Sequence, residues 1–417
     1  MTNKRAFAAL AISAGLVAGA CGSSHSSSSP TTVSSGSSAT TASGSSSSST
    51  TSGSASGGSL TPAAFTRDFS AMGQLKDVAS KGSGSIAVIL PDTVSSARYT
   101  EFDAPDLTKA FQTAGLSSSQ FSVKNAQGSD STQLTDAQSA ISAGASVLVV
   151  DPLDSGVGAQ IESYAKSHGV AVIDYDRLTL GGSRNYYISF DNVKVGTLMG
   201  QGLISCVSAW GVKSPQVIVM RGAATDNNAT LFAQGYEAAL ASKFNGGGWT
   251  QVAQPAGTWD PPTAETEFQQ ALTAHPSINA ALIPNDENSA PIIKYLQTQH
   301  VKAKTFPTTG QDATLVGLQN VLSGYQCGTV YKPIYAEAQA AAALALYLRA
   351  KETPPSTLVN GQTQDTTSHT QVQSVLLNPE WVTPQNMNST VIADNWVSKS
   401  QLCSGAYAAD CTAAGIS

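Results

Sequence analysis

Polar side chains follow several short apolar runs in this chain, at the points where buried strands would end. A further polar tip stands at Gly310-Gln311-Asp312. The carboxyl ends of the strands in an open α/β sheet line its ligand crevice, so acids, amides and bases gathered there predict a polar pocket that can hold hydroxyl groups. The runs with their tips cover residues 86–92, 147–151, 170–177, 217–228 and 280–286.

These strand-like runs alternate with helical patterns, which predicts βαβ units and parallel sheets. The clearest helical patterns cover residues 132–143, 158–167 and 336–349. Ahead of the first strand, apolar residues recur at spacings of three and four through residues 65–78, which predicts one short amphipathic helix. Its apolar positions are Phe65, Phe69, Met72, Leu75 and Val78.

The N-terminus has the pattern of a secretory signal. Lys4 and Arg5 precede an apolar run at residues 6–20 that is too short to span a membrane as a helix. Small residues stand directly before Cys21, which resembles a bacterial lipoprotein signal in which Cys21 carries the lipid. An ordinary signal peptide cut after Ala20 is the alternative.

Beyond Cys21 the chain is almost all Ser, Thr and Gly to about residue 58, which predicts a disordered, flexible tether. We therefore expect a lipoprotein signal peptide at 1–20 and an anchor cysteine with tether at 21–61. The globular body would be extracytoplasmic and lipid-anchored to the outer face of the cell membrane. About 330 residues follow the tether, more than one core usually serves, so two lobes are expected.

The composition argues against nucleic acid as a partner. A net charge of −6 and a pI near 5.3 give no basic footprint for nucleic acid.

Four cysteines remain besides Cys21, and an even number in an oxidising compartment suggests two disulfides with three possible pairings. We hypothesise Cys403 with Cys411 and Cys206 with Cys327. No cysteine or histidine spacing supports a zinc site.

Catalytic and cofactor motifs are absent from the sequence. It contains no G-x-G-x-x-G, P-loop, G-x-S-x-G or H-E-x-x-H pattern, and its five histidines stand alone. We therefore expect neither an enzyme nor a bound cofactor or metal.

A series of strings then points to a known family. Tyr175-Asp176-Arg177 precedes an unusual string at residues 186–192. Taken in order and spacing, the series resembles the periplasmic sugar-binding proteins that feed ABC importers, and within them the D-xylose-binding members. The resemblance covers residues 84–396. Further matching strings stand at residues 226–229, 285–286, 310–313, 330–333, 374–377 and 388–392.

The resemblance implies a two-lobed α/β fold of the type I periplasmic-binding-protein class. Each lobe would be a parallel sheet flanked by helices, and a three-segment hinge would join them. The expected N-terminal lobe is 62–188 plus 332–376, and the C-terminal lobe is 189–331 plus 377–417. The chain would cross between them near 186–192, near 330–333 and after Leu377.

The same resemblance implies a set of sugar ligands. An ionised Asp accepts a hydrogen bond from a sugar hydroxyl while Arg, Lys or Asn donates to its neighbour. Three bases and three acids in the set balance, which fits an uncharged polyol. The two aromatic residues would cover the apolar faces of the sugar ring. The set is Arg98, Tyr99, Asp176, Arg177, Asp226, Asn228, Trp259, Asn285, Asp312 and Lys332.

Structural roles remain open for eight of these ten residues. Asp176 and Arg177 could form an ion pair, and Trp259 could be a core or loop aromatic. Lys332 could be a solvated loop lysine. Four others could cap helices, since Asp and Asn are favoured there. These four are Asp226, Asn228, Asn285 and Asp312.

The expected function is capture of a monosaccharide, most simply D-xylose or a similar aldose, and its delivery by a monomer to the permease of an ABC importer. Residues 91–97, ahead of Arg98, depart from the family pattern, so contacts from this loop do not transfer. Two other classes remain open. One is a sugar sensor with a signalling partner, and the other is a carbohydrate-processing enzyme with a carboxylate pair flanking the scissile bond.

Overall fold

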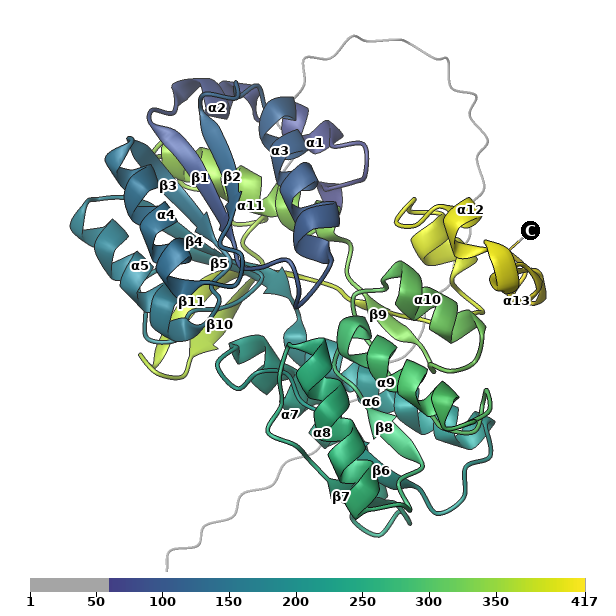
Figure 1. The fold of residues 1–417 in the computed structure, drawn as a ribbon. Coiled ribbons are helices and arrows are strands. Elements are labelled where there is room, and N and C mark those ends of the chain that lie inside the picture. Colours follow the sequence, from purple (N-terminus) through teal and green to yellow (C-terminus); the bar gives the residue numbers. More distant parts are fainter. Residues whose placement is uncertain (1–59, 417) are drawn as a thin grey trace, which may run out of the picture. The chain divides into compact units, whose positions relative to one another are not determined.

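The computed structural model describes residues 60–416. The expected signal peptide, the anchor Cys21 and the tether up to residue 59 lie outside these residues. No helix within 60–416 is long and apolar enough to cross a membrane. This part of the chain forms two lobes, which we define by the sheets they contain (Figure 1).

The first lobe is built on a seven-stranded sheet. Its strands are β1 (Ser85–Leu90), β2 (Phe121–Asn125), β3 (Ala145–Val150), β4 (Ala171–Tyr175), β5 (Tyr186–Phe190), β10 (Gly361–Asp365) and β11 (Thr370–Leu377). Their order is β10-β11-β5-β4-β3-β1-β2, and all pairs are parallel except β10 with β11 at one edge.

Helices cover both faces of this sheet. The helices of the lobe are α1 (Ser70–Gly73), α2 (Lys76–Lys81), α3 (Ala104–Thr113), α4 (Asp130–Ser142), α5 (Ser155–Ser167) and α11 (Ile334–Arg349). Side chains alternate between the faces of a strand. Ile86 and Val88 accordingly pack in the cluster with α3 and α11, while Ala87 and Ile89 pack in the cluster with α4 and α5.

The single helix expected at residues 65–78 is wrong. The short helix η1 (Pro62–Ala64) precedes this segment, which then forms α1 and the start of α2. Phe69, just before α1, has a left-handed conformation at φ 62°. The side chain of Asp68 accepts hydrogen bonds from Thr66 Oγ1 and from the backbone N–H of Ser70. Such local bonds compete with helix formation. The burial expected of the apolar stripe is nevertheless found for all its residues except Val78, which is only partly buried.

The second lobe contains two small sheets. Its strands are β6 (Gln216–Val219), β7 (Thr250–Ala253), β8 (Ala280–Leu282), β9 (Thr329–Tyr331) and β12 (Glu380–Val382). The first three form a parallel sheet of order β7-β6-β8, whereas β9 and β12 pair antiparallel. Both lobes are therefore parallel at the centre and carry one antiparallel pair.

Five main helices surround these sheets. They are α6 (Asn192–Ala209), α7 (Asn227–Phe244), α8 (Pro261–Ala274), α9 (Asp286–Thr298) and α10 (Leu315–Leu322). The backbones of α6 and α7 approach closely where glycines face each other. A Cβ on Gly196 would lie 1.9 Å from the carbonyl oxygen of Phe232, and one on Gly235 would lie 2.1 Å from that of Val193.

The chain crosses between the lobes three times, as expected. It passes from β5 into α6, from β9 into α11, and from β11 into β12. The type I periplasmic-binding-protein architecture predicted for the chain is thus the one observed.

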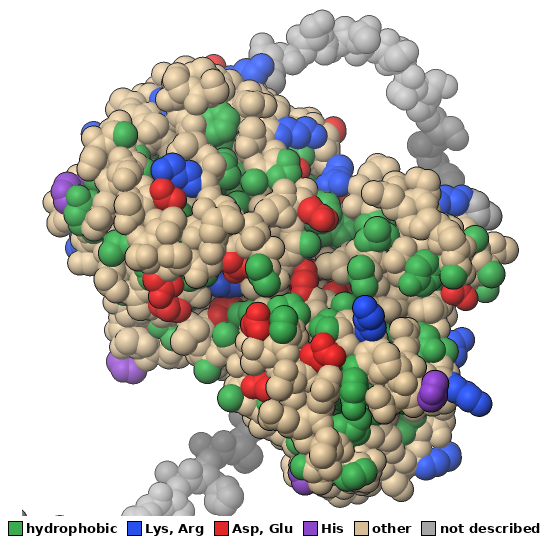
Figure 2. Space-filling view, in the orientation of Figure 1, with side chains coloured by type: hydrophobic (Ala, Val, Ile, Leu, Met, Phe, Trp, Pro, Cys, Tyr) green, Lys and Arg blue, Asp and Glu red, His purple; other side chains and the backbone are tan. Residues whose placement is uncertain are grey.

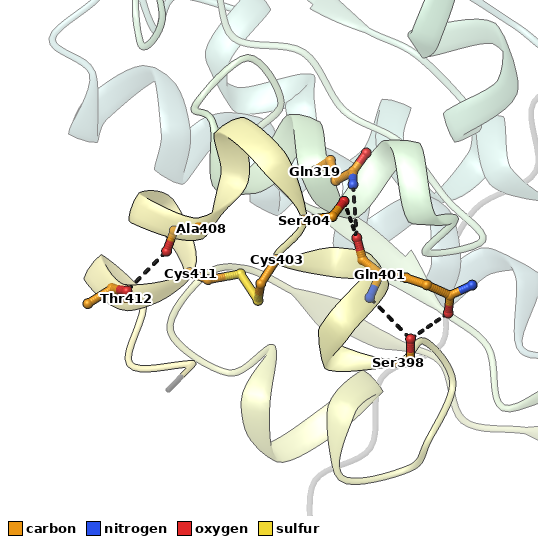
Figure 3. The surroundings of a disulfide bond; sticks show 8 residues. All are labelled: Gln319, Ser398, Gln401, Cys403, Ser404, Ala408, Cys411 and Thr412. Carbon is orange, nitrogen blue, oxygen red and sulfur yellow. Dashed lines mark hydrogen bonds between the residues drawn. A yellow bond between two sulfur atoms is a disulfide. The ribbon is translucent and has the colours of Figure 1, made fainter.

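After β12 a tail follows the second lobe. It contains η3 (Asn388–Ile392), α12 (Lys399–Leu402), η4 (Gly405–Tyr407) and α13 (Ala408–Ala413). A disulfide between Cys403 and Cys411 closes this tail (Figure 3), and a second one joins Cys206 of α6 to Cys327 just before β9. The hypothesised pairing is the one that the structure contains.

Candidate functional site

A small cavity lies between the lobes, and all ten side chains expected at the site border it. It has room of about 30 Å³ for the centres of water molecules, which is enough for about two waters. The side chains around it bond to one another, as the next paragraphs describe. Four further residues line the cavity: Ser95, Ser96, Phe232 and Gln311.

Arg98 stands in the first lobe, between β1 and η2 (Tyr99–Asp103), and is almost fully committed to acids of that lobe. Its Nε donates to Asp103 Oδ2 at 2.9 Å, and its Nη2 donates to Asp103 Oδ1 at 2.7 Å and to Glu337 Oε2 at 2.6 Å. Nη1 donates to Asp176 Oδ1 at 2.8 Å. A guanidinium has five N–H groups, so one remains for a ligand.

Asp176 directly follows β4 and has a left-handed backbone, with φ 58°. Arg98 holds its Oδ1, while Oδ2 has only a long contact of 3.4 Å with the hydroxyl of Tyr99. Burial opposes ionisation of this carboxyl, but Arg98, Lys332 and Arg177 outweigh burial, so the pKa of Asp176 lies below its usual value. The residue is therefore an oriented carboxylate with one oxygen largely open toward the cavity.

Arg177 lies beside Tyr99 and between two acids. Its Nη2 donates to the Tyr99 hydroxyl at 3.0 Å, and its Nε stands 3.5 Å from Asp226 Oδ2 and 3.7 Å from Asp151 Oδ1. The guanidinium carbons of Arg98 and Arg177 both lie over the ring of Tyr99, at 5.5 and 5.7 Å from its centroid. Tyr99 thus orders the two cations as well as bordering the cavity.

Asp226 and Asn228 come from the start of α7 in the second lobe. Asp226 caps the helix, as the alternative role proposed, because its Oδ1 accepts from the backbone N–H of Asn228. Its other oxygen accepts from the indole N–H of Trp259 at 3.0 Å. Asn228 Nδ2 donates to the carbonyl oxygen of Asp176 at 3.0 Å, which joins the two lobes. The indole of Trp259 packs over Gly222, where a Cβ would lie 2.1 Å from it.

The remaining three predicted residues also come together. Asn285 caps α9 through Oδ1 while its Nδ2 donates to the carbonyl oxygen of Ser95, across the lobes, at 3.0 Å. Lys332 Nζ forms an ion pair with Asp312 Oδ1 at 2.9 Å. A carboxylate oxygen has more than one lone pair, so Oδ1 can still accept a further hydrogen bond. Asp312 caps no helix.

Direct contacts between the lobes describe a closed state. Ser96 Oγ donates to Asp312 Oδ2 at 3.0 Å, and the backbone N–H of Ala97 donates to Glu287 Oε1 at 2.8 Å. Burial, together with the charge of Asp312, raises the pKa of Glu287 well above its usual value. Opening the cleft would break each of these contacts.

The sequence missed several of these participants for identifiable reasons. Ser95 and Ser96 lie in the loop that departs from the family pattern. Asp103 and Glu337 lie on helical segments, where an acidic residue is usually predicted to be solvent-exposed. Both are nevertheless fully buried. Burial raises the pKa of Glu337 to about 8. Gln311 stood inside a recognised polar tip, and its Oε1 is buried without a hydrogen-bond partner.

On the face shown in Figure 2, Lys and Arg side chains are scattered, and no basic patch gathers. Among residues 60–416 no group of three or more His, Cys, Asp or Glu is arranged to hold a metal ion. The hydrogen-bond donors and acceptors described above lie at the cavity between the lobes.

Known proteins resemble this chain in sequence. A family model described as periplasmic binding protein domain matches residues 86–353. The D-xylose-binding periplasmic protein of Escherichia coli is 34% identical over 285 residues, which are 67% of this chain and 82% of that protein. The multiple sugar-binding periplasmic receptor ChvE of Rhizobium radiobacter is 27% identical over 336 residues, which are 76% of this chain and 92% of that protein.

Solved structures share the fold. The solute-binding protein of a carbohydrate transporter from Chloroflexus aurantiacus, in complex with D-glucose, matches with a TM-score of 0.67 and 24% identity over 76% of this chain and 97% of that chain. The family match covers more than half of the chain, and the Escherichia coli relative is matched over most of its length. The chain is therefore a member of the periplasmic sugar-binding protein family.

Proposed function

We propose that this protein captures a monosaccharide in the cleft and delivers it to an ABC importer. The observation that supports this most is the ring of partly satisfied donors and acceptors supplied by both lobes. Asp176 Oδ2 and Asp312 Oδ1 can each accept from a sugar hydroxyl, while Arg98 and Lys332 can donate. The ten predicted residues are the proposed ligand set.

The charges around the cavity argue against an anionic ligand. Each cation at the cavity already faces at least one carboxylate: Arg98 faces three, Arg177 two and Lys332 one. An anionic ligand would need surplus cation, and none of these three provides it. Hydroxyl groups instead can insert between the existing partners, accepting from one and donating to the other.

The cavity has room for only about two waters. A pyranose must therefore enter an open cleft and displace contacts such as Trp259 with Asp226 and Ser96 with Asp312. Once bound, the sugar would take over those hydrogen bonds from both sides and favour closure. The importer would recognise the closed form.

We propose D-xylose or a similar aldose as the ligand. Two relatives are D-xylose-binding proteins by name, and others bind multiple sugars or ribose by name. Ser95 and Ser96 come from the loop that departs from the family, and Ser96 already bonds to Asp312. A single lost or gained hydrogen bond to a buried hydroxyl is worth roughly 1 to 3 kcal/mol, so this loop can shift the preferred sugar.

The wider proposal concerns location and organisation. The periplasmic relatives support an extracytoplasmic location. We also propose a lipid anchor at Cys21 and a monomeric protein. We also retain 62–188 plus 332–376 and 189–331 plus 377–417 as the lobes, with boundaries inside or beside β5, β9 and β11.

One relative is a receptor by name, so sensing is the second candidate function. We propose that the chain is not an enzyme, and release of reducing sugar from an oligosaccharide would contradict this.

Thermal unfolding of the mature protein against a panel of pentoses and hexoses tests the function. A ligand that binds only the folded state stabilises it by about 4 kcal/mol at a thousandfold excess over Kd. We expect a large rise in Tm with xylose or one other aldose and no rise with sugar acids or amino sugars. A protein that no monosaccharide stabilises would contradict the proposal.

A further inference from the structure

Trp396, in the tail after η3, is anchored on the second lobe. Its indole N–H donates to the carbonyl oxygen of Ala313 at 2.8 Å, and its ring meets that of Tyr331 edge-on, with centroids 5.2 Å apart. The tail around it is fastened as well, since Gln319 Nε2 of α10 donates to the carbonyl oxygen of Gln401 at 3.4 Å (Figure 3).

The same tryptophan also contacts the first lobe. Its ring stacks on Phe102 of η2, with centroids 3.5 Å apart and planes inclined by 13°. Next to it, Arg67 Nη2 of the first lobe donates to the carbonyl oxygen of Asn395 at 2.7 Å. Residues 395 and 396 therefore bridge the two lobes without taking part in the cavity.

The carbonyl that Trp396 holds belongs to an unusual turn. Asp312 and Ala313 have φ values of 87° and 48°, in the left-handed region that costs a non-glycine residue energy. Such a turn persists only when its surroundings fix it. Its other backbone bonds are Asp312 N–H to Val330 at 2.8 Å and Ala313 N–H to Thr329 Oγ1 at 3.1 Å. Trp396 adds the hydrogen bond to the carbonyl oxygen of Ala313.

This turn presents the Asp312 carboxylate to the ligand cavity. On the opposing lobe, Phe102 follows Arg98 by four residues in the same short segment. A second cavity of about 160 Å³ is lined by Arg98, Phe102, Asp312 and Trp396 together, so the aromatic stack and the two charged residues are neighbours in space.

We propose that Phe102 and Trp396 form a clasp that couples closure of the lobes to the position of the Asp312 carboxylate. Both are positioning residues, because neither borders the ligand cavity. Closing forms the stack, and the stack holds the indole against the turn that carries Asp312. The inference rests on the proposed function, which supplies the ligand whose affinity the clasp would set.

The first variant is Phe102→Leu, which removes the stack and leaves Trp396 bonded to Ala313. An aromatic stack contributes enough that its loss should weaken sugar affinity roughly two- to tenfold. Phe102→Tyr keeps the stacking face and should restore wild-type affinity. The matched control is Phe121→Leu, because Phe121 pairs with Phe111 inside the first lobe, at 5.2 Å between centroids. It should lower Tm without changing sugar affinity.

The second variant is Trp396→Phe, which keeps an aromatic ring and removes the bond to Ala313. We expect a similar loss of affinity, and a double variant with Phe102→Leu that loses less than the two single losses multiplied together. Such coupling arises only if the two residues act as one unit. Fully independent losses would overturn the clasp, because independent structural defects combine multiplicatively.

A readout without sugar separates this inference from the proposed function. Fluorophores at the exposed positions Ser118 and Gln299, one on each lobe, report the distance between the lobes. Phe102→Leu should shift the sugar-free protein toward larger distances, and Phe121→Leu should not. A distance distribution unchanged by Phe102→Leu overturns the clasp even if no sugar binds. Wild-type protein that binds no monosaccharide contradicts the proposed function alone.

Discussion

Two buried clusters in the first lobe have the same composition, one arginine and three carboxylates, but different surroundings. The Arg98 cluster contains Arg98, Asp103, Asp176 and Glu337, and the Arg184 cluster contains Arg184, Glu162, Asp174 and Asp365. Asp174 and Asp176 stand only two residues apart at the end of β4, yet they belong to different clusters.

The clusters differ in how their hydrogen bonds are completed. In the Arg184 cluster, backbone groups satisfy much of the acids' capacity: Asp174 Oδ2 accepts from the N–H of Thr179, and Asp365 accepts from the N–H of Gly181. In the Arg98 cluster, Asp176 keeps one oxygen nearly free beside the interlobe cavity. Buried charge alone therefore does not mark a site. Unused hydrogen-bonding capacity beside a cavity that two lobes share does mark one.

The largest expected effect follows from removing the charge that faces the cavity. Asp176→Asn loses a charge-assisted acceptor for the ligand and weakens the bond to Arg98, so we expect sugar affinity to fall about a thousandfold, or ~4 kcal/mol, in calorimetry. Asp174→Asn, the same change two residues earlier, is the control and should bind sugar normally. Equal affinity in both variants would contradict the distinction between the clusters.

The next effect concerns the Arg184 cluster and should appear in stability instead of binding. Arg184→Met leaves Glu162, Asp174 and Asp365 buried without their cation. Breaking a buried ion pair by removing one partner costs about 3 to 5 kcal/mol. Urea unfolding should show this loss, while the folded variant keeps wild-type sugar affinity. A variant that is stable but binds weakly would assign the Arg184 cluster to the site.

The smallest effect is a difference in pH dependence. Burial and the neighbouring Glu162 raise the pKa of Asp174 well above its usual value. The folded state then holds a proton that the unfolded chain has lost, so this group reduces stability as pH rises above ~4. Asp174→Asn should therefore become more stable relative to wild type as pH increases from ~4 to ~8, measured by urea unfolding at each pH. A constant difference would refute the assignment.

Asp176 should behave in the opposite way, because its pKa is lowered. Its contribution to stability is present above the usual carboxyl pKa and is lost as pH falls through the lower folded value. We therefore expect the contributions of Asp174 and Asp176 to the free energy of unfolding to change with pH in opposite directions.

Much of the site was predictable from the sequence because strand ends in a parallel sheet converge. The rule predicted that the polar ends of the runs at 170–177, 217–228 and 280–286 converge, and the family resemblance singled out Asp176, Asp226 and Asn285, which border one cavity. It did not separate Asp151 from Asp176, or Asp176 from Asp174 within the run at 170–177, although only Asp176 borders the cavity. Which of them faces the cavity depends on the pleat and on the left-handed backbone at Asp176, and neither can be read from the apolar pattern.

Other features were beyond sequence reasoning for similar reasons. The bonds of Arg98 to Asp103 and Glu337 depend on how η2 and α11 pack, which the sequence does not show. The break at Phe69 arises from the local bonds of Asp68. The fold itself followed from the alternation of strands and helices with the family resemblance. Its antiparallel edge pairs did not.

The three interlobe crossings are fastened to one another within the second lobe. The strand of the second crossing, β9, pairs with β12 of the third, and the disulfide from Cys327 to Cys206 ties the approach to β9 to the helix of the first. On the other side, β5 and β11 pair as well. Three crossings without contacts to one another would permit the lobes to shear and twist independently. The strand pairs and the disulfide oppose such shear and twist, which favours closure as a hinge rotation that brings the same side chains together.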